Sequence, residues 1–134
     1  MNKREKILSL KNHQQIFDFV VDHLYTQGRR SIESGWRPRL PGDDVCLYRD
    51  GNGASCAVGC LILDEEYNED FESLDTYGLV EKIPRLEPFT ELLDELQTVH
   101  DRPTNWNAGG FNGYEELQNI AQIAGLTMPE RKLF

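Results

Sequence analysis

The stretch Cys46–Leu63, CLYRDGNGASCAVGCLIL, holds all three cysteines, the clearest turn and the only long apolar run of the chain. It predicts two strands, Val45–Arg49 and Ala54–Leu63, joined by a turn at Gly51–Gly53 whose residues tolerate positive φ. The second strand is apolar on both faces, which favours a central position in a sheet. Gly59 inside it marks a bulge or a close approach by another element.

Three other segments have the periodicity of amphipathic helices. Residues 13–27 place apolar side chains on one helical face, and Gly28 follows as a typical helix C-cap. Residues 88–100 and 114–124 show the same pattern, whereas residues 69–87 are predicted to be irregular. We therefore expect an α+β fold, in which a small β-hairpin or antiparallel sheet packs against about three α-helices.

The length of 134 residues and a hydrophobic content of 39% predict a single domain spanning residues 1–134. Residues 29–44 contain two prolines, two glycines and four arginines, and predict an exposed loop. The ends, 1–11 and 127–134, are expected to be flexible. No apolar run reaches the roughly 18 residues of a membrane span, and the start lacks the apolar core of a signal peptide. A cytoplasmic protein is the expectation.

The net charge of −9 is distributed unevenly along the chain. Residues 64–101 hold thirteen acidic and two basic side chains, whereas residues 1–40 hold eight basic and four acidic ones. The acidic excess disfavours nonspecific nucleic-acid binding and suits a surface that docks on a basic protein. The alternative is a solvated acidic surface that only keeps the protein soluble.

Three cysteines without a secretory signal indicate thiols rather than a disulfide framework. On a strand, Cys56 and Cys60 would lie about 13 Å apart, too far to share one zinc ion. On a helix the same spacing would suit one site. Core packing is the favoured interpretation. The alternative metal site comprises Cys46, Cys56, Cys60 and His100. The alternative hydrolase would use His100 as its base and Asp101 as the orienting group.

Arginine and tryptophan side chains concentrate in and around the predicted loop. Arginine grips phosphates with a planar fork and tryptophan offers a stacking face, so they could hold a small nucleotide or anchor a partner protein. The alternative is a polar loop whose tryptophan packs back on the domain. The candidate binding residues are Arg29, Arg30, Trp36, Arg37, Arg39, Arg49 and Trp106.

A resemblance adds context to these residues. The pattern Cys46-x-Tyr48-Arg49, then Gly53, then Cys56-Ala57-x-Gly59-Cys60-Leu61-Ile62-x-Asp64, resembles a group of small bacteriophage and prophage proteins without an established activity. The later Leu96-Gln97-x-x-His100-Asp101 and the closing Gly125-Leu126 are similar too. The resemblance covers roughly residues 13–126. It implies a phage accessory protein acting in a bacterial host cell, in which the loop 29–44 is unusually long.

These features favour a non-enzymatic protein that neutralises a host factor by protein–protein contact through its acidic surface, in a counter-defence or host-takeover role. The first alternative is sequestration of a small nucleotide signal by the Arg/Trp loop. The second is a cysteine-dependent hydrolase or zinc-binding module. No cofactor and no membrane association are expected. Nucleic acid is disfavoured as a partner, and a homodimer is compatible with the sequence.

Overall fold

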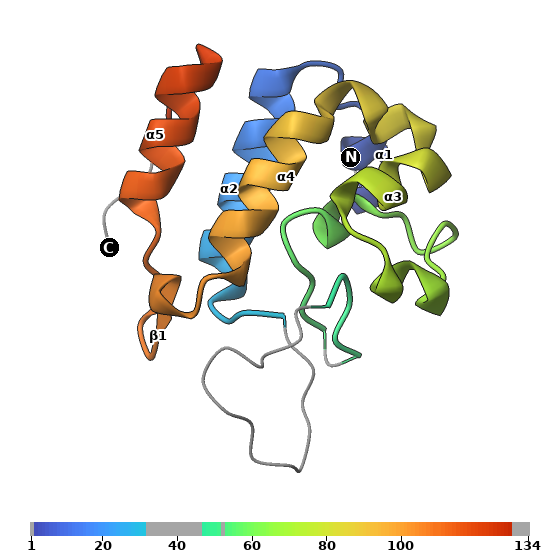
Figure 1. Ribbon diagram of the computed structural model, residues 1–134, viewed down its shortest axis with the longest axis horizontal. Helices are drawn as coiled ribbons and strands as arrows, with labels where there is room; N and C mark the ends of the chain where they lie inside the picture. Colours follow the sequence, from blue (N-terminus) through green and yellow to red (C-terminus); the bar gives the residue numbers. More distant parts are fainter. Residues whose placement is uncertain (1, 32–46, 52, 130–134) are drawn as a thin grey trace.

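The structure, a computed structural model, describes residues 2–31, 47–51 and 53–129 (Figure 1). Within these residues it is a small α+β fold. The helices are α1 (Lys3–Leu8), α2 (His13–Gln27), α3 (Thr76–Lys82), α4 (Thr90–Asp101) and α5 (Tyr114–Ala124). The 3-10 helices are η1 (Gly59–Leu61), η2 (Glu69–Ser73), η3 (Pro84–Phe89) and η4 (Pro103–Asn105). The strands β1 (Trp106–Asn107) and β2 (Gly110–Phe111) pair antiparallel.

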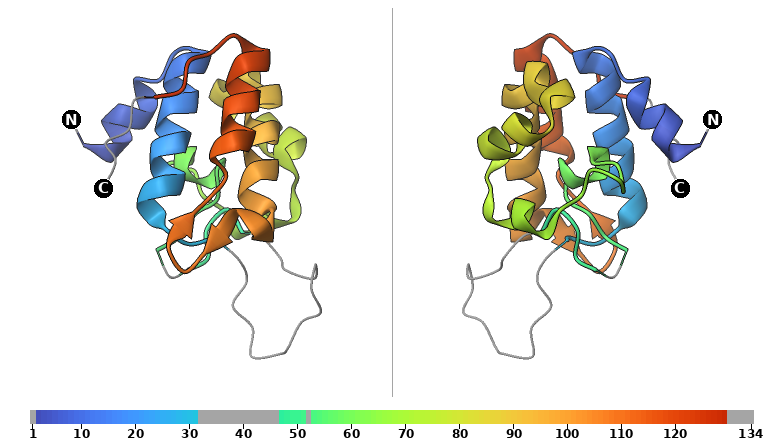
Figure 2. Two further views of the ribbon diagram at one scale, coloured as in Figure 1. Left: turned by 90° about the vertical axis from the view of Figure 1, so that its left-hand side faces the viewer. Right: turned by 90° about the vertical axis from the view of Figure 1, so that its right-hand side faces the viewer.

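The core lies between the three longer helices, which stand side by side in both views of Figure 2. Helix α4 packs against α2, α3 and α5, and its buried face consists of Leu92, Leu93, Leu96 and Val99. These helices confirm the prediction from apolar periodicity. The predicted C-cap of α2 is also confirmed, because Gly28 has a φ of 74° and ends the helix. None of the helices in the described part of the chain is long and apolar enough to cross a membrane.

Among the described residues, the predicted hairpin is reduced to a single bridge. The N–H of Asp50 donates to the carbonyl oxygen of Ala54 over 3.0 Å, and Arg49 pairs with Ser55 in an isolated antiparallel bridge. Beyond Cys56 the chain turns into η1, so the predicted strand Ala54–Leu63 is wrong. Its residues are buried on all sides except at Ser55, and an apolar run without alternation does not distinguish a buried strand from a buried helical turn.

The sheet lies elsewhere than expected, in the glycine- and asparagine-rich segment between α4 and α5. Trp106 pairs with Phe111 and Asn107 with Gly110. Each strand is only two residues long, which is too short for an alternating pattern to identify it. Segment 69–87, predicted to be irregular, contains α3, whose first turn is capped by the side chain of Asp75.

The described residues near both chain ends contact the rest of the fold. Helix α1 lies within residues 1–11, and its Ile7 side chain is buried. After α5, the backbone N–H and carbonyl of Thr127 both bond to the side-chain amide of Gln14, each over 2.9 Å. Residues 130–134 lie outside the described residues.

Only the first residues of the predicted loop 29–44 are described, since residues 32–46 lie outside. The residues that flank this segment are hydrogen-bonded to each other. The N–H of Leu47 donates to the carbonyl oxygen of Ser31 over 3.0 Å, and the Ser31 hydroxyl donates to the Leu47 carbonyl over 2.7 Å. Ser31 is fully buried, so the base of the segment belongs to the core.

Candidate functional site

Arg49, a candidate binding residue, is engaged inside the protein. Its guanidinium donates to the carbonyl oxygen of Ile62 over 2.8 Å and forms an ion pair with Asp64 at 2.9 Å. The same group lies 4.8 Å from the centre of the Tyr67 ring, within the range of a cation–π contact. These three contacts join the bridge at Arg49 to the segment that follows η1, which assigns the side chain a structural role.

Glu72, on η2, completes this polar cluster. Its carboxylate accepts the backbone N–H groups of Tyr48 and Arg49 at 2.7 and 3.1 Å and the hydroxyl of Tyr67 at 2.5 Å. Burial and the neighbouring carboxylate raise the pKa of Tyr67 to about 12. The backbone N–H groups of Tyr48 and Arg49 thus donate to Glu72 instead of to a neighbouring strand. Their hydrogen bonds are satisfied without a longer β-ladder.

The two arginines that follow α2 have partners other than those of Arg49. Arg29 forms an ion pair with Asp50 at 2.5 Å, and Arg30 donates to the main-chain carbonyl of Asp101 over 3.0 Å. The structure therefore does not bring the described arginine candidates together around one ligand. The other candidates of the predicted loop, Trp36, Arg37 and Arg39, lie outside the described residues.

Trp106 packs back on the domain. Its indole N–H donates to the carbonyl oxygen of His100 over 2.8 Å. Its ring makes edge-to-face contacts with His100 and Phe111, with centroid distances of 5.6 and 5.0 Å. The side chain is half-buried, and its polar end is already satisfied. This arrangement matches the structural alternative weighed for Trp106 in the sequence.

His100 and Asp101 form the base and orienting pair that a hydrolase would need, but the imidazole nitrogen that would take up the proton already accepts a hydrogen bond. The imidazole is fully buried, and Nδ1 lies 2.8 Å from the carboxylate of Asp101. Nε2 accepts the backbone N–H of Ser31 over 3.1 Å. A ring whose Nε2 accepts carries its proton on Nδ1, so it donates to Asp101. A catalytic base would need a free Nε2 lone pair, whereas here that lone pair accepts the backbone N–H of Ser31.

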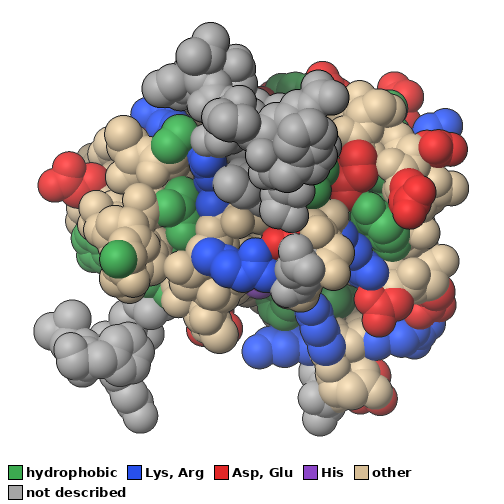
Figure 3. Space-filling view, turned by 90° about the horizontal axis from the view of Figure 1, so that it is seen from below, with side chains coloured by type: hydrophobic (Ala, Val, Ile, Leu, Met, Phe, Trp, Pro, Cys, Tyr) green, Lys and Arg blue, Asp and Glu red, His purple; other side chains and the backbone are tan. Residues whose placement is uncertain are grey.

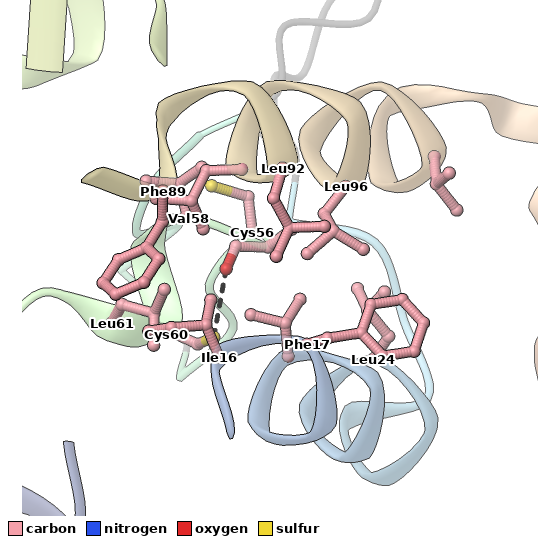
Figure 4. Close-up of a cluster of buried hydrophobic side chains, with 14 of the residues drawn as sticks. Ile16, Phe17, Leu24, Cys56, Val58, Cys60, Leu61, Phe89, Leu92 and Leu96 are labelled. Carbon is pink, nitrogen blue, oxygen red and sulfur yellow. Dashed lines mark hydrogen bonds between the residues drawn. The ribbon is translucent and has the colours of Figure 1, made fainter. Parts of the chain in front are cut away.

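Cys56 and Cys60 lie in the hydrophobic core between α2 and α4 (Figure 4). Their exposed fractions are 0% and 1%. The Cys60 thiol donates to the carbonyl oxygen of Ala57 over 3.1 Å, and the sulfur of Cys56 accepts the N–H of Gly59 over 3.2 Å. Burial raises the pKa of both thiols. Both groups are therefore neutral, which is unfavourable for a nucleophile.

The same two cysteines also lie one helical turn apart, since the N–H of Cys60 donates to the carbonyl of Cys56 over 3.0 Å. This is the spacing that could suit a shared metal ion. Nevertheless, residues 2–31, 47–51 and 53–129 contain no group of three or more His, Cys, Asp or Glu side chains that could hold one. Cys46 lies outside these residues.

Residues of the acidic segment 64–101 line two hollows beside helices α3 and α4. The larger, about 600 Å³, is lined by Tyr77, Glu81, Glu87 and Glu91 among others. The smaller, about 190 Å³, is lined by acidic side chains that include Asp75 and Asp94. We call the carboxylates of the two hollows the α3–α4 acidic surface: Glu72, Asp75, Glu81, Glu87, Glu91, Asp94 and Asp101.

No described lysine or arginine lines either hollow of the α3–α4 acidic surface. Glu81, Glu87 and Glu91 are exposed and form no ion pair with another described residue. By contrast, Asp64, Glu65 and Glu66, earlier in the segment, are paired with arginines. The charge of these three carboxylates is therefore largely compensated, in contrast to that of Glu81, Glu87 and Glu91.

A third hollow has more basic than acidic side chains in its lining. It is lined by Lys3 and Lys6 of α1 and by Arg29, with Phe19 and His23 of α2. Figure 3 shows the molecule from below, and on this face most Asp and Glu side chains lie on the right, whereas Lys and Arg side chains gather in the middle and lower part. The basic first third is evident in the sequence, but Lys3 and Lys6 do not stand out there, because the approach of α1 to α2 arises only in the folded chain.

The chain matches no protein-family model, no curated protein and no solved structure. The candidate sites therefore rest on the residues and contacts described above.

Proposed function

We propose that this protein is a phage accessory protein that binds and neutralises a basic host protein through the α3–α4 acidic surface. The observation that carries the proposal is the set of uncompensated carboxylates around one helix pair. Glu81, Glu87 and Glu91 line a single hollow without an ion-pair partner among the described residues. Like charges gathered without partners repel one another, and a cationic partner relieves that repulsion.

The hollow also offers apolar contact, which a surface that serves only solubility does not need. Tyr77 is 52% exposed although it is a large aromatic side chain. Val80 and Pro88 line the same hollow. Tyrosine is enriched in protein interfaces because it combines a large apolar face with a polar end. A basic partner could thus bury Tyr77 while its cations meet the surrounding carboxylates.

The smaller hollow adds a second contact for the same partner. Asp75 approaches it from the N-terminus of α3 and Asp94 from α4. Its volume of about 190 Å³ suits one lysine or arginine side chain rather than a drug-sized ligand. The phage and host setting comes from the sequence resemblance and the counter-defence role from the uneven charge of the chain, while the two acidic hollows support contact with a basic protein.

The proposal is tested by affinity capture from a bacterial host lysate with charge-reversed variants. The test protein carries Glu87→Lys and Glu91→Lys. The control carries Glu5→Lys and Glu115→Lys, which are also exposed and also lie at the beginnings of helices. Both variants change the net charge equally. We expect the wild type and the control to retain the same basic protein at physiological salt.

The retained protein is then purified and titrated against each variant. The reversal at Glu87 and Glu91 is expected to weaken binding by at least about tenfold, with an affinity that falls as salt rises. Equal retention by both variants would exclude the α3–α4 acidic surface as the interface. Retention of no basic protein by the wild type would contradict the proposed function itself.

A further inference from the structure

The cationic hollow between α1 and α2 has the dimensions of a small-molecule site. Its volume is about 480 Å³, and pockets for small ligands span roughly 300–1,000 Å³. Lys3 and Lys6 lie one helical turn apart on α1 and form one wall. Arg29, which follows the end of α2, forms another part of the lining.

The charge of this cavity is opposite to that of the molecule. Lys3 and Lys6 line it with the single carboxylate of Asp22, in a chain with a net charge of −9, while the third cation of the lining, Arg29, is already paired with Asp50. Neither Lys3 nor Lys6 forms an ion pair with another described residue. Two neighbouring ammonium groups repel each other, and one anion placed between them relieves this repulsion. The lining therefore favours an anionic occupant.

The remaining wall of the cavity is aromatic and uncharged. The ammonium group of Lys6 lies 5.8 Å from the centre of the Phe19 ring, so the cation and the ring belong to one surface. His23 donates from Nε2 to the carbonyl oxygen of Ser55 over 2.8 Å, which fixes its ring. Burial lowers the pKa of His23 and keeps the imidazole neutral near pH 7. The cavity thus combines a cationic side with a rigid, stacking side.

The geometry points to a binding site for a phosphorylated small molecule of nucleoside-monophosphate size. Lys3 and Lys6 hold the phosphate, since lysine binds phosphate as a point charge. Phe19 and His23 contact the organic body, and Asp22 accepts hydrogen bonds from its hydroxyl groups. Inorganic phosphate would satisfy the lysines but leave the aromatic side uncovered. None of these residues belongs to the α3–α4 acidic surface, so the inference is independent of the proposed function.

The test is calorimetric titration of the full chain with four probes: adenosine monophosphate, ribose 5-phosphate, inorganic phosphate and adenosine. We expect adenosine monophosphate to bind most tightly, with an affinity that falls as salt rises. The double variant Lys3→Gln/Lys6→Gln is expected to lose about tenfold or more in affinity, since it removes two charge-assisted contacts. The matched control Lys11→Gln/Lys82→Gln changes the same charge outside the cavity and keeps wild-type affinity.

Two further readouts separate a site from a general charge effect. The imidazole signals of His23 in nuclear magnetic resonance spectra should shift on addition of adenosine monophosphate, and circular dichroism should show both double variants folded. Absence of binding by both phosphorylated organic probes at millimolar concentration overturns the inference. So does equal affinity for inorganic phosphate and adenosine monophosphate, or wild-type affinity in Lys3→Gln/Lys6→Gln.

Discussion

The backbone of Gly59 lies directly against the carbonyl group of Tyr48: a Cβ atom at Gly59 would lie 2.1 Å from the Tyr48 oxygen. No side chain fits at that distance, and the obstacle is main chain that cannot rotate away. The sequence prediction that Gly59 marks a bulge or a close approach is thus confirmed in its second form. The approach holds η1 against the residues of the bridge.

The substitution Gly59→Ala is expected to lower the free energy of unfolding by about 3 kcal/mol, because the overlap must displace backbone in a packed core. Urea denaturation followed by circular dichroism measures it. Gly78→Ala is the control, since its Cβ would meet only side-chain atoms at 3.4 Å within α3. Alanine should stabilise that helix by up to about 1 kcal/mol. Similar effects of the two changes would contradict the close approach.

Replacing Glu72 by alanine is expected to destabilise the protein by about 3 kcal/mol. The change leaves the N–H groups of Tyr48 and Arg49 without their acceptor, and each unsatisfied group costs about 1–3 kcal/mol. Glu69→Ala on the same 3-10 helix removes an exposed carboxylate and should change stability by about 0.5 kcal/mol or less. Thermal unfolding of both variants decides whether Glu72 has this role.

The Glu72→Gln variant should also change the ionisation of Tyr67. Removing the negative charge lowers the pKa of the phenol from about 12 towards its ordinary value of 10.0. Phenolate absorbance during an alkaline titration measures the change, and a Tyr67→Phe variant identifies the transition. An unchanged transition in Glu72→Gln would mean that the carboxylate does not govern this group.

The thiols of Cys56 and Cys60 are expected to be unreactive in the native protein. Both are buried and their pKa values are raised, so the thiolate that attacks a disulfide reagent does not form. The measurement uses Ellman's reagent on a Cys46→Ala variant, in which only these two thiols remain. Modification should occur only at the rate of unfolding and become complete in denaturant. Rapid labelling of either thiol in the native state would revive the reactive-cysteine hypothesis.

Stability is expected to fall as the pH drops below about 6.5 because of His23. Burial lowers the pKa of this imidazole in the folded state, so between that value and the unfolded pKa of about 6.5 the unfolded chain binds more protons. The contribution is at most about 1.4 kcal/mol per pH unit. It should be absent from His23→Gln, measured as the difference between the two proteins from pH 7.5 to about 5.5. Parallel curves would refute it.

The sequence predicts those parts of the fold that depend on local periodicity. Helix α2 and its end at Gly28 follow from the apolar spacing of residues 13–27 and the glycine after them, and α5 follows from the spacing of residues 114–124. The structure of residues 56–63 could not be predicted in this way, because a run that is apolar throughout shows neither the helical nor the strand periodicity. The approach of Gly59 to Tyr48 then decides for a helical turn.

The candidate sites depend on contacts between distant residues, which local patterns do not contain. Charge segregation in the sequence pointed to residues 64–101, but not to the pairing that compensates Asp64 and leaves Glu87 and Glu91 without an ion pair to another described residue. In the sequence, Arg49 was a candidate ligand-binding residue. Its contact with the carbonyl oxygen of Ile62 forms only on folding, so local patterns could not show that the side chain is already engaged. Similarly, Lys6 and Phe19 lie together only because α1 folds back on α2.

Two hydrogen bonds between Ser31 and Leu47 join the residues that flank positions 32–46. Both contacts involve Ser31, which is buried, so they hold the residues on either side of positions 32–46 next to each other. Each doubling of a closed loop costs only about 0.6 kcal/mol. Lengthening the chain between Ser31 and Leu47 is therefore expected to cost little closure entropy, which makes this position a suitable insertion point for an engineered peptide.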